Sequence, residues 1–431
     1  MSGARGRSSR PARQSGLSLI ELMVALVITM MASLLMFQTM TLGEGGKRTA
    51  RGGNESMRAG TMVLDELSFL VRTAGTGLAQ IPGAYGCALT AYRGGAQVLP
   101  FGGTLPAPFD AVPTAPFRMA PVMAFDGGDT PDVLLVMSGS SASANIAIPR
   151  AEAMVGGESI GVTNTVGIRQ NDAVLMTRLM RSGALLQPAD CFLTQVNVAA
   201  ADLNAATGYV ESNPFSVAGN TYSAPIGTLP VGARYTLATL GTAPVAMLIG
   251  VRRGAGRSDL VAYDLLAQTG PTVLAENIVD FQVLYGVDTN ATAGRSINTD
   301  IDFFGDGIVD DWVAPIGEWS AANLRDPAPG GATSWNGPER QRRIKSLRLA
   351  IVTVDSEVSR KAVDRLDQTV RLFDGAVDKG NGSLRIERTL GTGGWWDQRS
   401  RYQVFESIVP VRNLTGGLSP LEPNLIFAAS P

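Results

Sequence analysis

An apolar run near the N-terminus constrains this chain more than any other feature. Residues 17–37 (LSLIELMVALVITMMASLLMF) hold one charged side chain, Glu21. At about 1.5 Å of rise per residue, a helix of this length crosses the ~30 Å hydrocarbon core of a bilayer. The run is longer than the apolar part of a secretory signal, and no small-residue cleavage site follows it. We therefore predict a helix that is retained in the membrane.

The segments on either side of the run bear on its orientation. Residues 1–16 contain four arginines and no acid, which favours a cytoplasmic N-terminus. Lys47, Arg48 and Arg51 follow the run and weaken that asymmetry. The long remainder is rich in glycine and proline and contains both cysteines of the chain. This composition favours export, so we expect residues 76–431 to form a β-rich globular head outside the cytoplasm.

Composition excludes several classes of function. The 431 residues include no histidine, which removes Ser–His–Asp and Cys–His catalytic systems and histidine-ligated zinc. The net charge of −2 argues against a dedicated nucleic-acid binder. Two cysteines cannot form a four-thiolate metal site. In an oxidising compartment we predict one disulfide, Cys87–Cys191, which closes a loop of roughly 100 residues and contributes on the order of 4 kcal/mol.

Glu21 is out of place in an apolar helix, where an unpaired carboxylate costs roughly 2.5–3.5 kcal/mol. An acid tolerated at the interface, helped by the dipole of the helix N-terminus, is one explanation. A second comes from its surroundings. The sequence Gly16-Leu17-Ser18-Leu19-Ile20-Glu21, behind a basic leader, resembles the processing motif of type IV prepilins. That family usually has Phe where this chain has Leu17.

The prepilin resemblance implies a role for each of three residues. The leader, residues 1–16, would be cut off after Gly16, Leu17 would become the methylated N-terminus, and Glu21 would be the fifth mature residue. The free amine of Leu17, in the same chain or a neighbour, could then pair with Glu21. Such a pair would fix the axial register between subunits, which is an attested use of buried polar groups. Residues 17–42 would be the transmembrane and assembly helix.

Residues 43–75 are predicted to be a second, amphipathic part of that helix. Glycines at 43, 45, 46, 52 and 53 indicate breaks or flexibility between the two parts. An apolar stripe then follows at helical spacing and ends by Gly75 or Gly77; its members are Met57, Gly60, Leu64, Leu67 and Val71. We expect the stripe to pack on a β-sheet. Residues 76–131, which are rich in Gly and Pro, are interpreted as an ordered loop region that holds Cys87.

Short strands are predicted at 132–137, 173–178, 191–196, 245–251 and 260–266. Three later segments have the best strand patterns: 277–286, 344–355 and 401–413. We expect these three to form an antiparallel sheet packed on the amphipathic helix, with 344–355 buried on both faces. Residues 356–400 begin with a helical pattern at 358–366 and end rich in glycine. The predicted fold class is α+β, a long N-terminal helix on an antiparallel β head with long loops.

Parts of the final third resemble the PilW family of minor type IV pilins. The segments are VLYGVD at 283–288, GDGIVDDWV at 305–313 and RYQVFESIVPVRNL at 401–414. The first carries the family's Tyr-Gly-x-Asp, and an insertion separates it from the acidic turn. The matching residues are Tyr285, Gly286, Asp288, Tyr402, Phe405, Arg412 and Asn413.

Weaker signals are an acidic turn, a basic run and the tryptophans. Alternating acids in a Gly-hinged loop could hold calcium, although the EF-hand spacing is not met and a surface turn is the simpler interpretation; the candidates are Asp300, Asp302, Asp306 and Asp310. No other cofactor is expected. The basic run at 340–345 could bind a polyanion, but we interpret it as a solvated strand edge. Tryptophans near turns are interpreted as packing residues, not as a ligand surface.

These resemblances imply a structural protein and not an enzyme. It would be a minor pilin, incorporated into a type IV pilus or initiating its assembly, with roles in adhesion and twitching motility. Its partners would be a prepilin peptidase and other major and minor pilins, with no nucleic acid. It would be anchored in the bacterial inner membrane by residues 17–37, with its head in the periplasm, before reaching the pilus and cell surface. Alternatives are a type II secretion pseudopilin and a membrane-anchored exported adhesin or enzyme.

Overall fold

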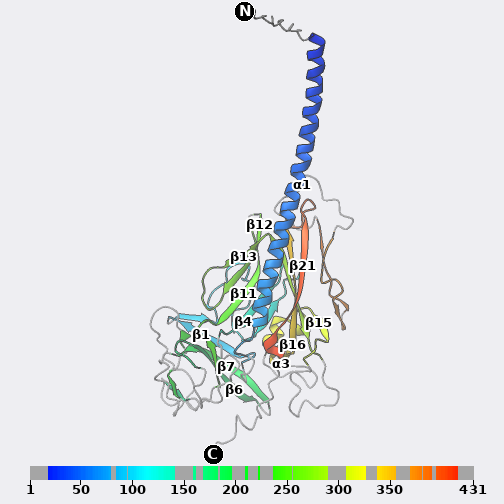
Figure 1. Ribbon diagram of the computed structural model, residues 1–431. Helices are drawn as coiled ribbons and strands as arrows, with labels where there is room; N and C mark the ends of the chain where they lie inside the picture. The colour runs from blue at the N-terminus through cyan, green and yellow to red at the C-terminus, as the bar shows by residue number, and fades with distance from the viewer. Residues whose placement is uncertain are drawn as a thin grey trace, which may run out of the picture. The chain divides into compact units, whose positions relative to one another are not determined.

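The computed structural model (Figure 1) describes residues 18–78, 84–94, 96–140, 159–161, 168–182, 185–196, 209–211, 222–223, 236–254, 256–289, 307–326, 337–355, 369–380, 382–390 and 395–415. The chain divides into two compact units, Met1–Asn54 and Glu55–Pro431. The predicted helix at 358–366 and calcium candidates Asp300, Asp302 and Asp306 lie outside the described residues, as do Gly16 and Leu17.

Helix α1 runs without a break through Leu19–Thr73, 55 residues. The predicted break at the glycines between 43 and 53 is therefore wrong. A glycine inside a helix costs only about 1 kcal/mol. A break would leave up to eight backbone groups without helical partners and would require the second part to nucleate again. The glycines weaken this stretch of helix but do not end it.

Within the second unit, one face of α1 is buried and the opposite face is exposed. Gly60, Leu67 and Val71 of the predicted stripe are buried, and Leu64 is partly buried. Met57 is 58% exposed, which contradicts its place in the stripe. The buried face instead continues through Val63 and Ser56, because 56, 60, 63 and 67 follow the four-three spacing of one helix face.

The predicted three-stranded sheet is confirmed and has a fourth strand. Its order is β15 (Asp311–Val313), β14 (Ile278–Val287), β16 (Ile344–Val354) and β21 (Tyr402–Pro410), and all neighbours are antiparallel. Strand β21 ends at Pro410, and the short helix α4 (Arg412–Thr415) replaces the predicted end of the strand. In the register, Ile351 lies between Phe281 and Phe405.

Strand β16 is buried on both faces, as predicted. Its side chains alternate between the two faces of the sheet, and each face contributes to a different core. Leu347, Leu349 and Ile351 belong to the core that contains the buried face of α1. Ala350 and Val352 belong to a second core, which is covered by hairpins from residues 369–390. These hairpins pair β17 (Thr369–Leu372) with β20 (Ile386–Thr389) and β18 (Val377–Asp378) with β19 (Gly382–Ser383).

Two more sheets complete the head (Figure 1). One has the order β13 (Thr272–Glu276), β12 (Arg257–Asp264), β11 (Val245–Gly254), β4 (Val133–Ser138) and β3 (Val122–Phe125). The other runs β10 (Thr236–Gly241), β6 (Ala173–Ser182), β7 (Leu185–Gln195), β1 (Ala88–Arg93) and β2 (Ala96–Leu99), with β9 (Tyr222–Ser223) on β1. A separate pair joins β5 (Ser159–Gly161) to β8 (Tyr209–Glu211).

The interpretation of residues 76–131 as a loop region is wrong in part, because β1, β2 and β3 lie within it. Glycines and prolines dominate this segment, but they fall between the strands. Strand β1 also pairs in parallel with β7, which is distant in sequence. Pairing with a remote strand leaves no local signal that would reveal such a short segment.

Candidate functional site

The first candidate site is the N-terminal part of α1. Residues Leu19–Met40 have a mean hydropathy of 2.4, and no part of the segment is buried, so by length and composition it can cross a membrane. Its hydroxyls donate back to carbonyls one turn earlier, as in Thr29 Oγ1 to Ala25 O at 2.8 Å and Thr39 Oγ1 to Met36 O at 2.9 Å. The segment therefore presents an apolar surface to lipid or to other apolar helices.

Glu21 lies in the first turn of α1 and is exposed. Its backbone N–H donates to Ser18 O at 3.0 Å, so the residue is within the region where the helix dipole favours a negative charge. Residues 18–40 contain no lysine or arginine. A cation for the Glu21 carboxylate must therefore come from outside this segment.

The second candidate site is the contact that holds the head part of α1 on the four-stranded sheet. A Cβ atom at Gly60 would overlap the ring of Phe405 on β21. Beside it, the hydroxyls of Ser56 and Thr353 share a buried hydrogen bond. Glycine is thus required here for a close approach of helix and strand. The sequence stripe placed Gly60 on the right face, but only the packing explains why the residue is glycine.

The end of α1 is held by Asn413, which follows β21. Its Nδ2 donates to Ala74 O at 2.8 Å, to Thr73 O at 3.4 Å and to Thr76 Oγ1 at 2.9 Å. These carbonyls belong to the last turn, where helical partners are lacking. Gly75 follows with φ of +76°, which confirms the predicted helix end. Asn413 thus joins the C-terminal strand of the sheet to the end of the helix.

Replacing Asn413 with alanine is expected to destabilise the head by about 1–3 kcal/mol, because carbonyl groups at the helix end lose their donor. The comparison is urea unfolding of the detergent-solubilised full chain, with Arg401→Ala, an exposed arginine just before β21, as the control. Equal unfolding midpoints for the two variants would contradict the capping role.

Tyr285 and Gly286 of the PilW-like motif are packing residues at the junction of two sheets. Tyr285 is fully buried, and its hydroxyl accepts the backbone N–H of Ala124 on β3. Burial raises the pKa of Tyr285, so the hydroxyl stays protonated. A Cβ atom at Gly286 would overlap Ser346 Oγ, which explains the glycine.

Asp288 organises the acidic turn. Its Oδ2 accepts the N–H of Gly307 at 2.7 Å. Its backbone N–H donates to Arg343 O at 2.9 Å, and its backbone carbonyl accepts a hydrogen bond from Arg343 Nη1 at 2.9 Å. Asp310 Oδ2 accepts the N–H of Thr289 at 3.1 Å. The two ends of the insertion thus meet at the end of β14. Among the described residues no group of three acids or other metal ligands comes together. Because Asp300, Asp302 and Asp306 are outside those residues, calcium binding stays a prediction.

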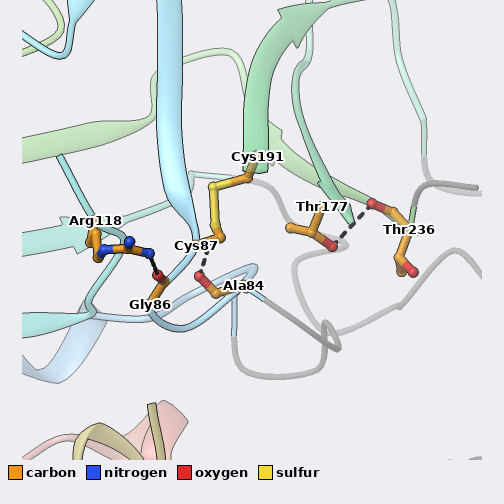
Figure 2. Close-up of a disulfide and its surroundings, with 7 residues drawn as sticks. All are labelled: Ala84, Gly86, Cys87, Arg118, Thr177, Cys191 and Thr236. Carbon is orange, nitrogen blue, oxygen red and sulfur yellow. Dashed lines mark hydrogen bonds between the residues drawn. A yellow bond between two sulfur atoms is a disulfide. The ribbon is translucent and has the colours of Figure 1, made fainter. Parts of the chain in front are cut away.

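The predicted disulfide is confirmed. Cys87 and Cys191 are bonded, with Cα atoms 5.8 Å apart and a sequence separation of 104. Figure 2 shows the bond beside β1, where Arg118 donates to Gly86 O at 2.8 Å. Leu89 of β1 lies opposite Cys191 of β7 in the parallel register. The disulfide therefore ties together the two strands whose pairing has the least local support from sequence.

The basic run at 340–345 is not the solvated strand edge that was predicted. Arg340, Arg343 and Lys345 are at most 9% exposed. The run begins in helix α3 (Gly337–Arg343), and Lys345 Nζ donates to Arg342 O at 3.0 Å and Leu414 O at 3.3 Å. Cations at the C-terminal end of a helix bond to its last carbonyls. Lys345 therefore holds α3 and α4 to β16, and the burial of Arg340 and Arg343 leaves no solvated polyanion patch among these described residues.

The described tryptophans pack within the head, as predicted. Trp396 is 7% exposed and lies against Tyr402, with ring centroids 5.1 Å apart. Trp319 is also buried, and Trp312 lines Gly286.

Sequence patterns gave no indication of the buried carboxylate Asp132. Its oxygens accept the N–H groups of Gly127 and Val283, each at 2.9 Å, so it joins the start of β4 to β14. Burial is the largest effect on the pKa of Asp132. Together with the carboxylates of Asp126 and Asp280, and against the two hydrogen bonds, it raises that pKa from 3.8 to about 7. A lone aspartate before a strand resembles any turn residue, so only the fold reveals its role.

The raised pKa of Asp132 predicts a pH-dependent stability. Between about pH 4 and 7 the folded chain keeps a proton that the unfolded chain has released. The free energy of unfolding therefore falls as the pH rises through this window, by up to about 4 kcal/mol at 1.36 kcal/mol per pKa unit. Urea unfolding of the full chain in detergent at several pH values measures it. Asp132→Asn should weaken this dependence, and an unchanged slope in the variant would contradict the assignment.

Two family models match the chain. Residues 254–413 match PilW, the type IV pilus-assembly protein W, and residues 11–37 match the prokaryotic N-terminal methylation motif. The first match covers the four-stranded sheet and ends at Asn413, the residue that holds α1. No curated protein and no solved structure matches the chain. The matches indicate a structural, non-enzymatic protein of a pilus system that is anchored by its apolar helix. Together with the pilin-like fold, the two matches support a resemblance of this chain to PilW-like type IV minor pilins over the matched residues.

Proposed function

We propose that this chain is processed as a prepilin and joins a type IV pilus through α1. A prepilin peptidase would cut between Gly16 and Leu17 and methylate Leu17. The mature chain would stay in the inner membrane with its head in the periplasm until assembly. The observation that carries the proposal is the 22-residue apolar segment Leu19–Met40, none of which is buried by the described part of the chain. Such a surface requires lipid before assembly and other apolar helices after it.

The size of the head supports a place at the tip or in the initiating complex. A chain of 431 residues carries a head that is difficult to repeat in a tight helical lattice and easy to place at one end. Other pilins, major and minor, would contact α1 in that position. Adhesion and twitching motility would then depend on the chain through the pilus that it helps to build.

The proposal is tested by locating the chain. Pili sheared from cells should contain a small, constant amount of it relative to the major subunit, and deletion of its gene should reduce the number of pili. Co-purification with secretion pseudopilins, together with normal piliation of the deletion strain, would instead support a secretion pseudopilus. Recovery only in the membrane fraction, with neither set of partners, would support an anchored adhesin or enzyme.

A further inference from the structure

Strand β21 is an edge of the four-stranded sheet, and β16 is its neighbour on one side. Just past the end of this pair, the N–H of Val411 donates to Lys345 O at 2.9 Å. Backbone groups of an antiparallel strand point to alternate sides, and the register of the pair is unbroken. Counting back from Val411 in steps of two therefore identifies the residues whose backbone groups face β16. The residues between them turn their N–H and C=O groups away from the sheet; they include Val404, Glu406 and Ile408. In the described part of the chain, no strand pairs with β21 on that side.

The usual safeguards of an edge strand are missing along β21. Natural edges carry lysines, bulges or prolines, which discourage pairing with a further strand. The nine residues of β21 include no lysine and no bulge, and their proline is the last residue, Pro410. Their one charged side chain, Glu406, is bound within the head: its Oε2 accepts Arg348 Nη2 at 2.7 Å, and its Oε1 accepts the N–H of Phe373 at 2.6 Å. The edge of β21 can therefore accept another strand.

The same edge exposes apolar side chains. Val404 and Ile408 are 37% and 57% exposed, and in the described strands of this sheet no other large apolar side chain is exposed. Val404 lies directly opposite Val352, a member of the second core, and Ile408 is on the same face of β21. The second core therefore ends at β21 with an uncovered apolar margin, and a strand added to the edge would bring its side chains beside both residues.

The chain itself supplies a segment of matching chemistry. Residues 416–431 follow α4 and lie outside the described residues. They begin with Gly416-Gly417, which permits a reversal of the chain direction. Residues 424–430 (NLIFAAS) then contain Leu, Ile and Phe side chains, with no charge, proline or glycine. An uncharged apolar segment of this length has the composition that pairs readily as a strand.

The chain leaves the described fold at the end of β21 from which an antiparallel strand would start. Helix α4 begins two residues after Pro410, and Lys345 Nζ donates to Leu414 O at 3.3 Å, so α4 stays beside that end. The connection 416–423 reaches about 26 Å, which is more than the ~6 Å length of α4. A parallel strand would require the connection to cross the whole of β21 first, about 30 Å. The connection therefore favours the antiparallel arrangement.

We propose that residues 424–430 add to β21 of the same chain as an antiparallel fifth strand of the sheet. A register with Leu425 opposite Ile408 also places Ala429 opposite Val404, so the added strand covers the apolar margin. It would bond to the outward N–H and C=O groups of β21 and would shield the edge from strands of other molecules. The contact lies within one chain, so it does not depend on the proposed function.

A photo-crosslinking amino acid at position 408 of the detergent-solubilised full chain tests the contact. After irradiation, the adduct is mapped by tandem mass spectrometry. The expected adduct lies within one chain and joins position 408 to residues 424–430. Position 273 is the matched control, because Val273 is also an exposed apolar residue of an edge strand, β13, but in another sheet. It should give no adduct with residues 424–430.

Amide hydrogen exchange tests the strand pairing independently. In the full chain, the amides of β21 that point away from β16 should be protected, because the added strand accepts their hydrogen bonds. The variant L425D/F427D places two charges in the added strand and should speed the exchange of these amides at least about tenfold. The matched control is L418D/L421D, which introduces the same charges into the connection and should exchange like the wild type. Circular dichroism verifies that both variants keep the fold.

Several results would overturn the inference. They are an adduct of position 408 with another segment, a second copy or a different protein, no adduct at all, or the same exchange of the outward amides in both double variants. None of these measurements involves cleavage after Gly16 or entry into pili, so such a result leaves the proposed function standing. A chain that forms the expected adduct but keeps its leader and is absent from pili would contradict the proposed function instead.

Discussion

Glu21→Val should leave the protein expressed and processed but reduce its amount in sheared pili at least tenfold. The reason is that residues 18–40 supply no cation, so the Glu21 carboxylate requires one from a free N-terminal amine. Close charge pairs across protein–protein interfaces have coupling energies of about 1.5–7 kcal/mol, and about 1.4 kcal/mol corresponds to a factor of ten. Valine keeps the helix apolar and removes only this pairing. Quantitative immunoblotting of the pilus and membrane fractions measures the change.

The matched control for Glu21 is Thr29→Val in the same segment. Among the described residues, Thr29 Oγ1 bonds only within the helix, to Ala25 O and Leu26 O, so its loss should not alter the amount of the chain in pili. If Glu21→Val and Thr29→Val pili contain the same amount as the wild type, Glu21 does not set the register between subunits.

Arg388→Ala should destabilise the head by about 3–5 kcal/mol, because it leaves a buried charge without its partner. Arg388 Nε lies 2.8 Å from Asp280 Oδ2, and the two side chains are 8% and 0% exposed. The other Asp280 oxygen accepts the backbone N–H of Phe281 at 2.9 Å and Gln282 Nε2 at 3.0 Å. This ion pair ties β20, in the hairpins over the second core, to β14 of the sheet.

Urea unfolding of the detergent-solubilised full chain provides the measurement, with Arg385→Ala as the control. Arg385 pairs with Glu387 at 2.7 Å, but both side chains are more than 40% exposed. Exposed pairs contribute about 0–1 kcal/mol. A loss in Arg388→Ala as small as that in Arg385→Ala would show that the buried pair does not hold the hairpins to the sheet.

Local patterns predicted the elements whose side chains repeat along one face. The buried face of α1, its end at Gly75 and the strands β14, β16 and β21 all follow from such repeats. The disulfide followed from composition, since two cysteines allow one pairing. Met57 was assigned to the wrong face because 57 and 60 fit helical spacing almost as well as 56 and 60.

Other features depend on contacts between segments far apart in sequence. Asp132 meets Val283, Asp280 meets Arg388, and Asn413 meets Ala74 across more than a hundred positions each. The basic run at 340–345 was predicted to be solvated because charge normally indicates exposure. Lys345 is instead buried, and carbonyls of α3 and α4 accept its hydrogen bonds. Glycine spacing predicted a break in α1, but propagation along an established helix outweighs the glycine cost.

The most direct test of the account is the N-terminal residue of the protein extracted from membranes of piliated cells. Edman degradation or intact mass determination identifies it. We predict a chain that begins with N-methylated Leu17 and lacks residues 1–16, which would place Glu21 fifth. A chain that begins at Met1 in cells with normal pili that contain it would contradict processing and the pairing of Glu21 with a new amine.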